Sequence, residues 1–382
     1  MKRANTISTS VIVLIGIFVL GYIFVLYSVI FPAAPTAVKP TGSTVPSQPV
    51  DIRIIAVKDQ EIERLNRELK KLKEEKALVP IAAVQSSVVV QNGGYRPGLI
   101  ILGMHRSGTS IIGGLINKMG LKTGGPLIQA AEDNAKGFFE RIDVVLQNDI
   151  IMHKQRIDYS LNMYKYDTMQ GLKDILTESI VFKEGKRGLA FLNDPASYPW
   201  MLKDPRLCVT FRTWLPLLNF IPAILFTYRH PMDVALSFLH RYEHFPIGKS
   251  LKMWYVYNRR AIVQSHDLCR VTTSHRAVMA QPLQEMQRLY TEIKACGVEV
   301  SHELTKAEVE DFVDPKLQHG RSALKDTSCE LDHSTLTPPA IWEHPEPQNI
   351  PLYREVMRVF CAMEDGSAFK PDFHWDETIK DA

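Results

Sequence analysis

Cysteine is scarce in this chain, and no two cysteines are spaced as a metal-binding or redox pair. The 382 residues include only five cysteines, with no C-x-x-C motif among them. This argues against zinc-ribbon and dithiol redox functions, and we expect no metal site. In an oxidising compartment one or two disulfides would form, and the odd number would leave at least one thiol unpaired or intermolecular. The chain also lacks an N-x-[ST] glycosylation site.

An excess of charge of one sign is also missing. The chain has 45 lysine and arginine residues against 42 aspartate and glutamate residues. Residues 1–96 hold 12 of the basic and 7 of the acidic side chains, which leaves 33 against 35 for residues 97–382. Because nucleic-acid binding depends on a broad basic surface, we expect no nucleic-acid partner. Local basic pockets remain compatible with this balance.

The first long apolar run predicts a membrane anchor. Residues 11–31 carry no charge over 21 positions, and as a helix they would span about 31 Å, enough for a bilayer core. A cleaved signal peptide is the alternative, but its apolar region is usually shorter. Lys2 and Arg3 precede the run, so residues 1–10 are predicted to be a cytoplasmic tail and the rest to lie across the membrane. This is a single-pass, type II arrangement.

Residues 32–96 are predicted to be a linker and a stalk. Proline, threonine and serine are frequent in residues 32–50, which is typical of an extended, solvated linker. Ile55, Ile62 and Leu69 then follow one another at seven-residue intervals, with Leu65 and Leu72 between them. This short seam over residues 55–72 is compatible with a solvated stalk helix or with a homodimeric coiled coil.

From residue 97 onward, apolar strand-like runs alternate with helix-like patterns. Such alternation predicts an α/β domain over residues 97–382, with a P-loop-type parallel sheet flanked by helices on both faces. The expected strands are residues 98–104, 199–203, 223–229 and 276–281, each followed by a helical pattern.

The loop after the first expected strand predicts an anion-binding site. Its sequence, G-M-H-R-S-G-T-S over residues 103–110, is nearly the phosphate loop G-x-x-x-x-G-K-[ST], but Thr109 stands where the lysine belongs. Gly108 would let the backbone approach a phosphate at the helix amino terminus, and Arg106 would supply the missing positive charge. A plain tight turn is the alternative interpretation. The absent lysine and the lack of a convincing magnesium-holding aspartate argue against an ATPase or GTPase; residues 188–194 are the nearest candidate for that strand.

A second motif supports the first. Arg229 ends an apolar strand, and Pro231 begins the helix that follows it. Ser237 stands eight residues after Arg229, so the side chains of Arg229 and Ser237 could bind one further phosphate.

Together, "HRSGTS" and "YRHPMDVALS" resemble the sulfotransferase family that uses 3′-phosphoadenosine 5′-phosphosulfate (PAPS). The resemblance extends through residues 134–140, 202–208, 254–259 and 312–319, and so covers most of residues 97–320. It implies that the first loop binds the 5′-phosphosulfate and that the second motif binds the 3′-phosphate. The implied donor-binding residues are Arg106, Ser107, Gly108, Thr109, Ser110, Arg229 and Ser237, with Arg321 as a further basic residue near the 3′-phosphate.

The catalytic residues expected from this resemblance are Arg106, Glu140 and Lys203. Glu140 follows two phenylalanines, which would raise its pKa as a general base requires, although it could instead cap or salt-bridge the helix that begins near Ile142. Lys203 and Arg206 would contact the sulfate or an anionic acceptor, or would form a structural ion pair with Asp204. His105 and His230 are weaker candidates for the base. Trp254 and Tyr257, at helical spacing, are expected in the core.

The expected function is therefore sulfuryl transfer in the secretory lumen, with the Golgi membrane as the expected location. A glycan is the favoured acceptor, ahead of protein tyrosine or a small hydroxylated compound. The alternatives are a P-loop kinase, a Golgi glycosyltransferase, and a non-catalytic nucleotide-binding scaffold. A glycosyltransferase is disfavoured because the chain has no D-x-D motif.

Overall fold

The computed structural model describes residues 96–131, 134, 136–177, 182–242, 244–313, 329, 333–340, 342 and 345–381. The chain divides into two units, Met1–Glu75 and Lys76–Ala382, and all described residues belong to the second. The predicted tail, the anchor at residues 11–31, the seam at residues 55–72 and Arg321 lie outside the described residues. Among the described residues, no helix has the length and apolar character needed to cross a membrane.

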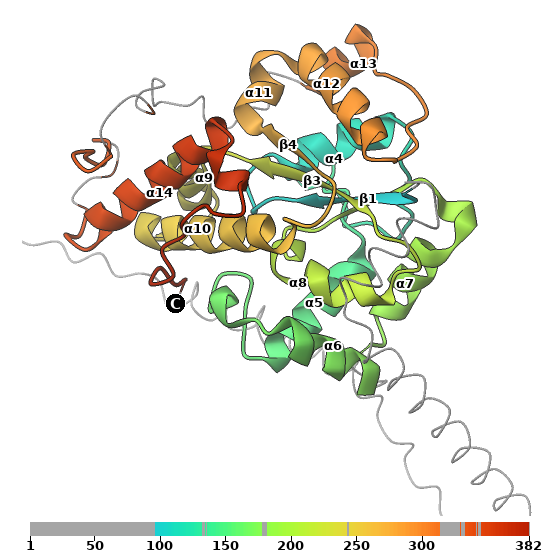
Figure 1. Ribbon diagram of the computed structural model, residues 1–382, viewed down its shortest axis with the longest axis horizontal. Helices are drawn as coiled ribbons and strands as arrows, with labels where there is room; N and C mark the ends of the chain where they lie inside the picture. The colour runs from blue at the N-terminus through green and yellow to red at the C-terminus, as the bar shows by residue number, and fades with distance from the viewer. Residues whose placement is uncertain are drawn as a thin grey trace, which may run out of the picture. The chain divides into compact units, whose positions relative to one another are not determined.

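A four-stranded parallel sheet forms the centre of the described domain (Figure 1). Its strands stand in the order β2-β1-β3-β4, so the first strand lies between the second and the third. Their bounds are β1 Gly98–Leu102, β2 Trp200–Lys203, β3 Ala223–Tyr228 and β4 Arg270–Ser274. Because neighbouring strands are parallel, their carboxyl ends meet at one edge, where ligands bind in sheets of this kind.

Successive residues of each inner strand pack on opposite faces of the sheet. In β1, Ile100 and Leu102 belong to one apolar cluster, whereas Leu99 and Ile101 belong to the other, and all four side chains are buried. Period-two alternation with both sets apolar is what a sheet covered on both faces requires. This confirms the predicted fold class for the described domain.

Helices cover both faces of the sheet, with α4, α11, α12 and α13 on one side and α8, α9, α10 and α14 on the other (Figure 1). The largest cluster of buried residues includes Trp254 and Tyr257 of α10, which are fully buried as predicted. The helices are α4 Thr109–Lys118, α5 Ile142–Lys154, α6 Thr168–Thr177, α7 Gly185–Asn193, α8 Leu207–Trp214, α9 Pro231–Arg241, α10 Ile247–Gln264, α11 His275–Ala280, α12 Pro282–Ala295, α13 Lys306–Phe312 and α14 Asn349–Glu364. Short 3₁₀ turns lie at Met163–Lys165, Pro195–Ser197, Leu215–Leu217 and Ser367–Phe369.

One predicted strand was wrong. Residues 276–281 lie largely in α11, and the fourth strand is the preceding segment, β4. The boundary is set by Ser274, whose hydroxyl accepts a hydrogen bond from the backbone N–H of Ala277 and so caps α11. A serine N-cap of this kind stabilises a helix start by about 1 kcal/mol, and the β-branched residues Val271, Thr272 and Thr273 before it favour the strand.

The cysteines form two disulfides and leave one thiol unpaired, which agrees with the expectation from their odd number. Cys269 is bonded to Cys296, and Cys329 is bonded to Cys361. Cys208 is a buried free thiol. Its sulfur accepts a hydrogen bond from the N–H of Gly103, the first residue after β1.

Candidate functional site

The loop between β1 and α4 is a tight turn with two residues in the left-handed region. Arg106 and Gly108 both have positive φ, at 68° and 84°, and Gly108 is the N-cap of α4. A side chain at Gly108 would come within 2.7 Å of the His275 ring, so both the left-handed conformation and the close approach favour glycine. The first N–H groups of a helix have no intrahelical acceptor. Those of α4 therefore converge where the loop ends.

Ser107 has an unsatisfied buried hydroxyl in this loop. Its side chain is fully buried, yet its hydroxyl has no hydrogen-bond partner. Buried hydroxyls are nearly always paired, and a water, an ion or a ligand could supply the missing partner. Thr109 is also buried and opens α4 beside it. These donors and the helix amino terminus fit a phosphate or sulfonate group.

The two sequence motifs meet at this loop. The Arg106 guanidinium donates from Nε to the hydroxyl of Ser237 at 2.9 Å, across 131 residues of sequence. The Arg229 guanidinium donates from Nη1 to the carbonyl oxygen of Arg106 at 3.3 Å. Two arginines and a serine from β1–α4 and β3–α9 thus lie together at the carboxyl edge of the sheet, although the contact between Arg106 and Ser237 was not predicted.

Arg229 is a buried cation that Asp233 partly neutralises. Its side chain is 11% exposed, and its Nε lies 3.6 Å from a carboxylate oxygen of Asp233, beyond hydrogen-bond distance. Burial lowers the pKa of Arg229, and Asp233 opposes that shift. The indole N–H of Trp254 donates to the Arg229 carbonyl oxygen at 2.9 Å, which fixes the end of β3. The Arg229 Nε–H has no hydrogen-bond partner, so an anion at this place would gain one.

Glu140 and Lys203 form a buried ion pair beside the loop. Lys203 Nζ lies 2.5 Å from Glu140 Oε1, and their side chains are 2% and 8% exposed. The same ammonium donates to the carbonyl oxygen of Phe138 at 3.1 Å and to the hydroxyl of Ser110 at 3.2 Å. Burial raises the pKa of Glu140 above its ordinary value, while the Lys203 charge opposes the rise. Glu140 lies just before α5, as the sequence indicated. Its ion-pair partner is Lys203 at the end of β2, so it does not form the predicted alternative, a cap or salt bridge to that helix.

Arg206 and Asp204 form a structural ion pair. This is the alternative that the sequence "KDPR" allowed beside a contact with the sulfate. Arg206 donates to Asp204 at 3.1 Å and to Asp149 at 2.6 Å. Asp204 is fully buried and also accepts a hydrogen bond from Asn148 at 2.8 Å. Lys203 takes no part in this network, because its ammonium points to Glu140.

The two histidine candidates have different surroundings. His105 packs its ring against Tyr159 and Tyr257, with ring centroids 5.3 and 5.7 Å away. Burial holds the pKa of His105 well below its ordinary value, and Arg206 and other nearby cations add to this effect. His105 is therefore neutral at physiological pH. His230 packs its ring against Phe360 of α14 at 4.8 Å.

His275 is a site neighbour that sequence reasoning missed. It begins α11 directly after β4, lies against Gly108, and has its pKa lowered to about 3 by burial and by the charge of Arg229. The signal that could have found it is positional: residues after parallel strands gather at one edge. Placing the fourth strand six residues too late concealed that signal.

The described residues contain no cluster of His, Cys, Asp or Glu that could hold a metal ion. The sequence considered as a magnesium-binding strand, residues 188–194, lies in and just after α7 and is therefore helical. Asp204, which follows β2, already accepts hydrogen bonds from Asn148 and Arg206. Arg321 belongs to the undescribed part of the chain, so its predicted place near the second phosphate stays a prediction.

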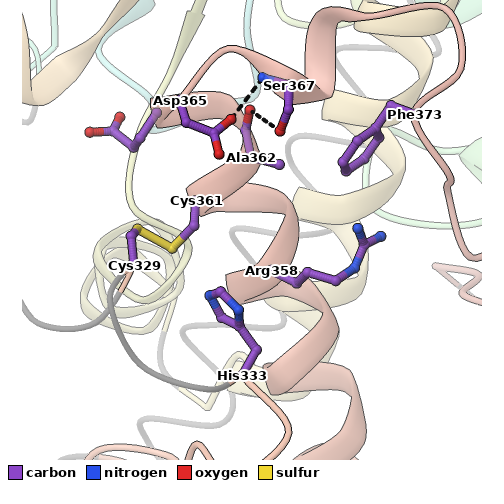
Figure 2. A pocket seen from close by; sticks show the side chains of 9 residues that line it. Cys329, His333, Arg358, Cys361, Ala362, Asp365, Ser367 and Phe373 are labelled. Carbon is purple, nitrogen blue, oxygen red and sulfur yellow. Dashed lines mark hydrogen bonds between the residues drawn. A yellow bond between two sulfur atoms is a disulfide. The ribbon is translucent and has the colours of Figure 1, made fainter.

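A pocket of about 490 Å³ lies elsewhere, at the carboxyl end of α14 (Figure 2). The Cys329–Cys361 disulfide borders it, and Arg358 and Phe373 project towards it. No predicted site residue within the described part of the chain lines this pocket. Its polar groups include Glu364 and Asp365 as well as Arg358, so its charge is mixed.

No family model and no curated protein sequence matches the chain. Among solved structures, the chain is similar to retinol dehydratase in complex with androsterone and the inactive cofactor PAP. The two chains are 14% identical, and the superposition has a TM-score of 0.31. The match covers 57% of this chain and 63% of the retinol dehydratase chain, which is less than two thirds of that protein. A likeness of this extent assigns no function to the chain.

Proposed function

We propose that this protein is a sulfotransferase that moves a sulfuryl group from PAPS to a hydroxyl or amine of an acceptor. The observation that carries the proposal is the contact between Arg106 of the first motif and Ser237 of the second, with Arg229 bonded to the same loop. Two anion-binding motifs side by side suit a ligand with two separated phosphate groups. Ser107 and Arg229 add buried donors that a ligand would complete.

The assigned roles follow from the positions of the side chains. Glu140 would take the proton from the acceptor oxygen as that oxygen forms a bond to sulfur. The bond from sulfur to the 5′-phosphate oxygen breaks at the same time, and its electron pair stays on the leaving phosphate. Arg106 and the amides of the loop would stabilise that phosphate, and Lys203 would face the sulfonate. Preorganised donors of this kind contribute about 3–4 kcal/mol each to lowering a barrier.

A P-loop kinase is the second enzyme class, and the site gives it less support. The lysine that bridges the terminal phosphates of a nucleotide triphosphate is replaced by Thr109. Asp204, the aspartate that follows β2, is already bonded to Asn148 and Arg206. A non-catalytic scaffold is disfavoured because Lys203 and Glu140 remain paired beside the loop.

The acceptor and the location are further parts of the proposal. A type II membrane protein anchored by residues 11–31 would present its site to the secretory lumen, where glycans, protein tyrosines and small hydroxylated compounds are available. We favour a glycan in the Golgi. Homodimerisation through residues 55–72 belongs to the same proposal, and nothing in the charge balance indicates a nucleic-acid partner.

The experiment is a transfer assay with ³⁵S-labelled PAPS and a panel of glycans, tyrosine peptides and small alcohols. The expected result is label in at least one acceptor with the wild-type chain, and loss of that label in Glu140→Gln although the variant still binds 3′-phosphoadenosine 5′-phosphate (PAP). Full turnover in Glu140→Gln would remove Glu140 from its role. Absence of PAP binding by the wild type would overturn the proposal.

A further inference from the structure

Lys203 is fully engaged in the described structure. Its ammonium has three protons and three acceptors within hydrogen-bond distance: Glu140 at 2.5 Å, Phe138 O at 3.1 Å and Ser110 Oγ at 3.2 Å. Its side chain is 2% exposed. The lysine therefore neutralises Glu140 instead of presenting an unpaired charge to the loop.

The same contact restrains Glu140. A carboxylate held at 2.5 Å by an ammonium is a weaker base than an unpaired one, because the cation favours its ionised form. Glu140 is 6% exposed, so water does not compete with Lys203 for it. The contact with Lys203 therefore removes part of the basicity that burial gives Glu140.

Ser110 connects this pair to the anion site. It is the second residue of α4, at the end where the unpaired N–H groups of the helix gather. Its hydroxyl accepts from Lys203 on one side and from the side-chain amide of Asn134, at 3.1 Å, on the other. An anion bound at the start of α4 would therefore lie next to the Lys203 ammonium as well.

We propose that Lys203 is a charge shared between Glu140 and the donor, so that donor binding releases the base. This inference rests on the proposed sulfotransferase function and adds a regulation of the same site. The contact between Lys203 and Glu140 restrains the carboxylate. The sulfonate and 5′-phosphate of the bound donor attract the ammonium towards Ser110, and the Glu140 carboxylate becomes available to the acceptor hydroxyl. Deprotonation of the acceptor is thereby coupled to the presence of the donor.

Because coupling between two sites is reciprocal, Glu140 must also weaken donor binding. Removing its charge should let Lys203 interact fully with the donor anion. We expect Glu140→Gln to bind PAP at least about fivefold more tightly than the wild type, the lower end of couplings between sites. Lys203→Met should bind PAP more weakly. The combined variant should show little of the gain seen with Glu140→Gln alone, since the gain requires the lysine.

The test is calorimetric titration of the purified full chain with PAP, using the wild type, the two single variants and the combined variant. Asp149→Asn is the matched control, because it also removes one negative charge near the site, but from Arg206. Its affinity for PAP should change much less than that of Glu140→Gln. Glu140→Asp keeps a buried carboxylate for Lys203 while lengthening the contact, so it should fold even if Glu140→Gln does not. It should bind PAP more tightly than the wild type, by a smaller factor.

Unchanged or weaker PAP binding by Glu140→Gln and Glu140→Asp, at wild-type melting temperature, would overturn the inference. An equal gain from Glu140→Gln in the presence and absence of Lys203 would also overturn it, since that result is simple charge repulsion. Failure of the proposed function looks different: the wild type would then not bind PAP, or would bind it equally well after Arg229→Met.

Discussion

Replacing Arg229 by methionine separates a ligand-binding arginine from a structural one. The side chain is 11% exposed, and its ion partner Asp233 lies 3.6 Å away. Hydrogen bonds to charged groups contribute about 1.5–3 kcal/mol. At 1.4 kcal/mol for each factor of ten, loss of one such contact to a phosphate should weaken PAP binding by about 10- to 150-fold.

The stability of the ligand-free variant should change little. Methionine keeps the apolar part of the side chain and removes a buried charge that is only partly neutralised. Asp233 stays in the first turn of α9, where the helix dipole favours a carboxylate. We expect the melting temperature to stay within about 3 °C of the wild type, equivalent to roughly 1 kcal/mol for a domain of this size.

The assay compares two ligands on both proteins by calorimetry. Adenosine 5′-monophosphate lacks the 3′-phosphate, so its affinity should be the same for the wild type and Arg229→Met, while the affinity for PAP falls. Equal losses for both ligands would refute the assignment of the 3′-phosphate to Arg229. A large fall in melting temperature with unchanged PAP affinity would show that Arg229 is a structural residue.

Three further outcomes are expected. Trp254→Phe removes the indole N–H that donates to the Arg229 carbonyl oxygen. The free energy of unfolding, measured with denaturant, should fall by about 1–3 kcal/mol, and PAP binding should weaken. Unaltered PAP affinity would show that the indole contributes packing alone. Replacing both Cys269 and Cys296 by serine opens a loop with a sequence separation of 27. The free energy of unfolding should fall by about 3–4 kcal/mol. Equal stability of the oxidised and reduced wild type would contradict the pairing. His275 has a folded-state pKa of about 3 and an unfolded pKa near 6.5, so the unfolded chain binds more protons as pH falls below about 6.5. Between pH 7 and pH 5 this should cost about 2 kcal/mol of stability, and His275→Gln should lose less over the same interval in parallel melting experiments; identical pH dependence would show that His275 is not buried as described.

Much of the fold was predictable because its signals are local. Continuous apolar runs marked β1, β2 and β3, and Pro231 marked the start of α9. These signals lie in adjacent residues, because a continuous apolar run is typical of a strand buried on both faces and proline fixes its own φ. The strand β4 was misplaced because Arg270 and two threonines interrupt its apolar character, and the run around Val278 is more apolar. Its position depends on pairing with β3, which is a tertiary contact.

The positions of the residues that we propose bind the donor were predictable for a similar reason. Gly108 and Arg229 carry local backbone requirements, a left-handed turn and a strand end, and topology brings such ends together. The partners of Lys203 were not predictable. Glu140 and Lys203 are separated by 63 residues, and only folding determines that the lysine turns to Glu140 rather than to Asp204. His275 escaped notice for the same reason, since its contact with Gly108 joins the ends of two different strands.

The proposed function is tested most directly by asking whether the purified protein binds PAP in preference to ATP with magnesium. Calorimetric titration of both nucleotides, without and with magnesium, measures this on one sample. We predict tight binding of PAP that needs no magnesium, together with weaker binding of ATP, since the bridging lysine of nucleotide triphosphatases is replaced by Thr109. Preferential binding of magnesium-ATP, or no binding of PAP, would contradict it.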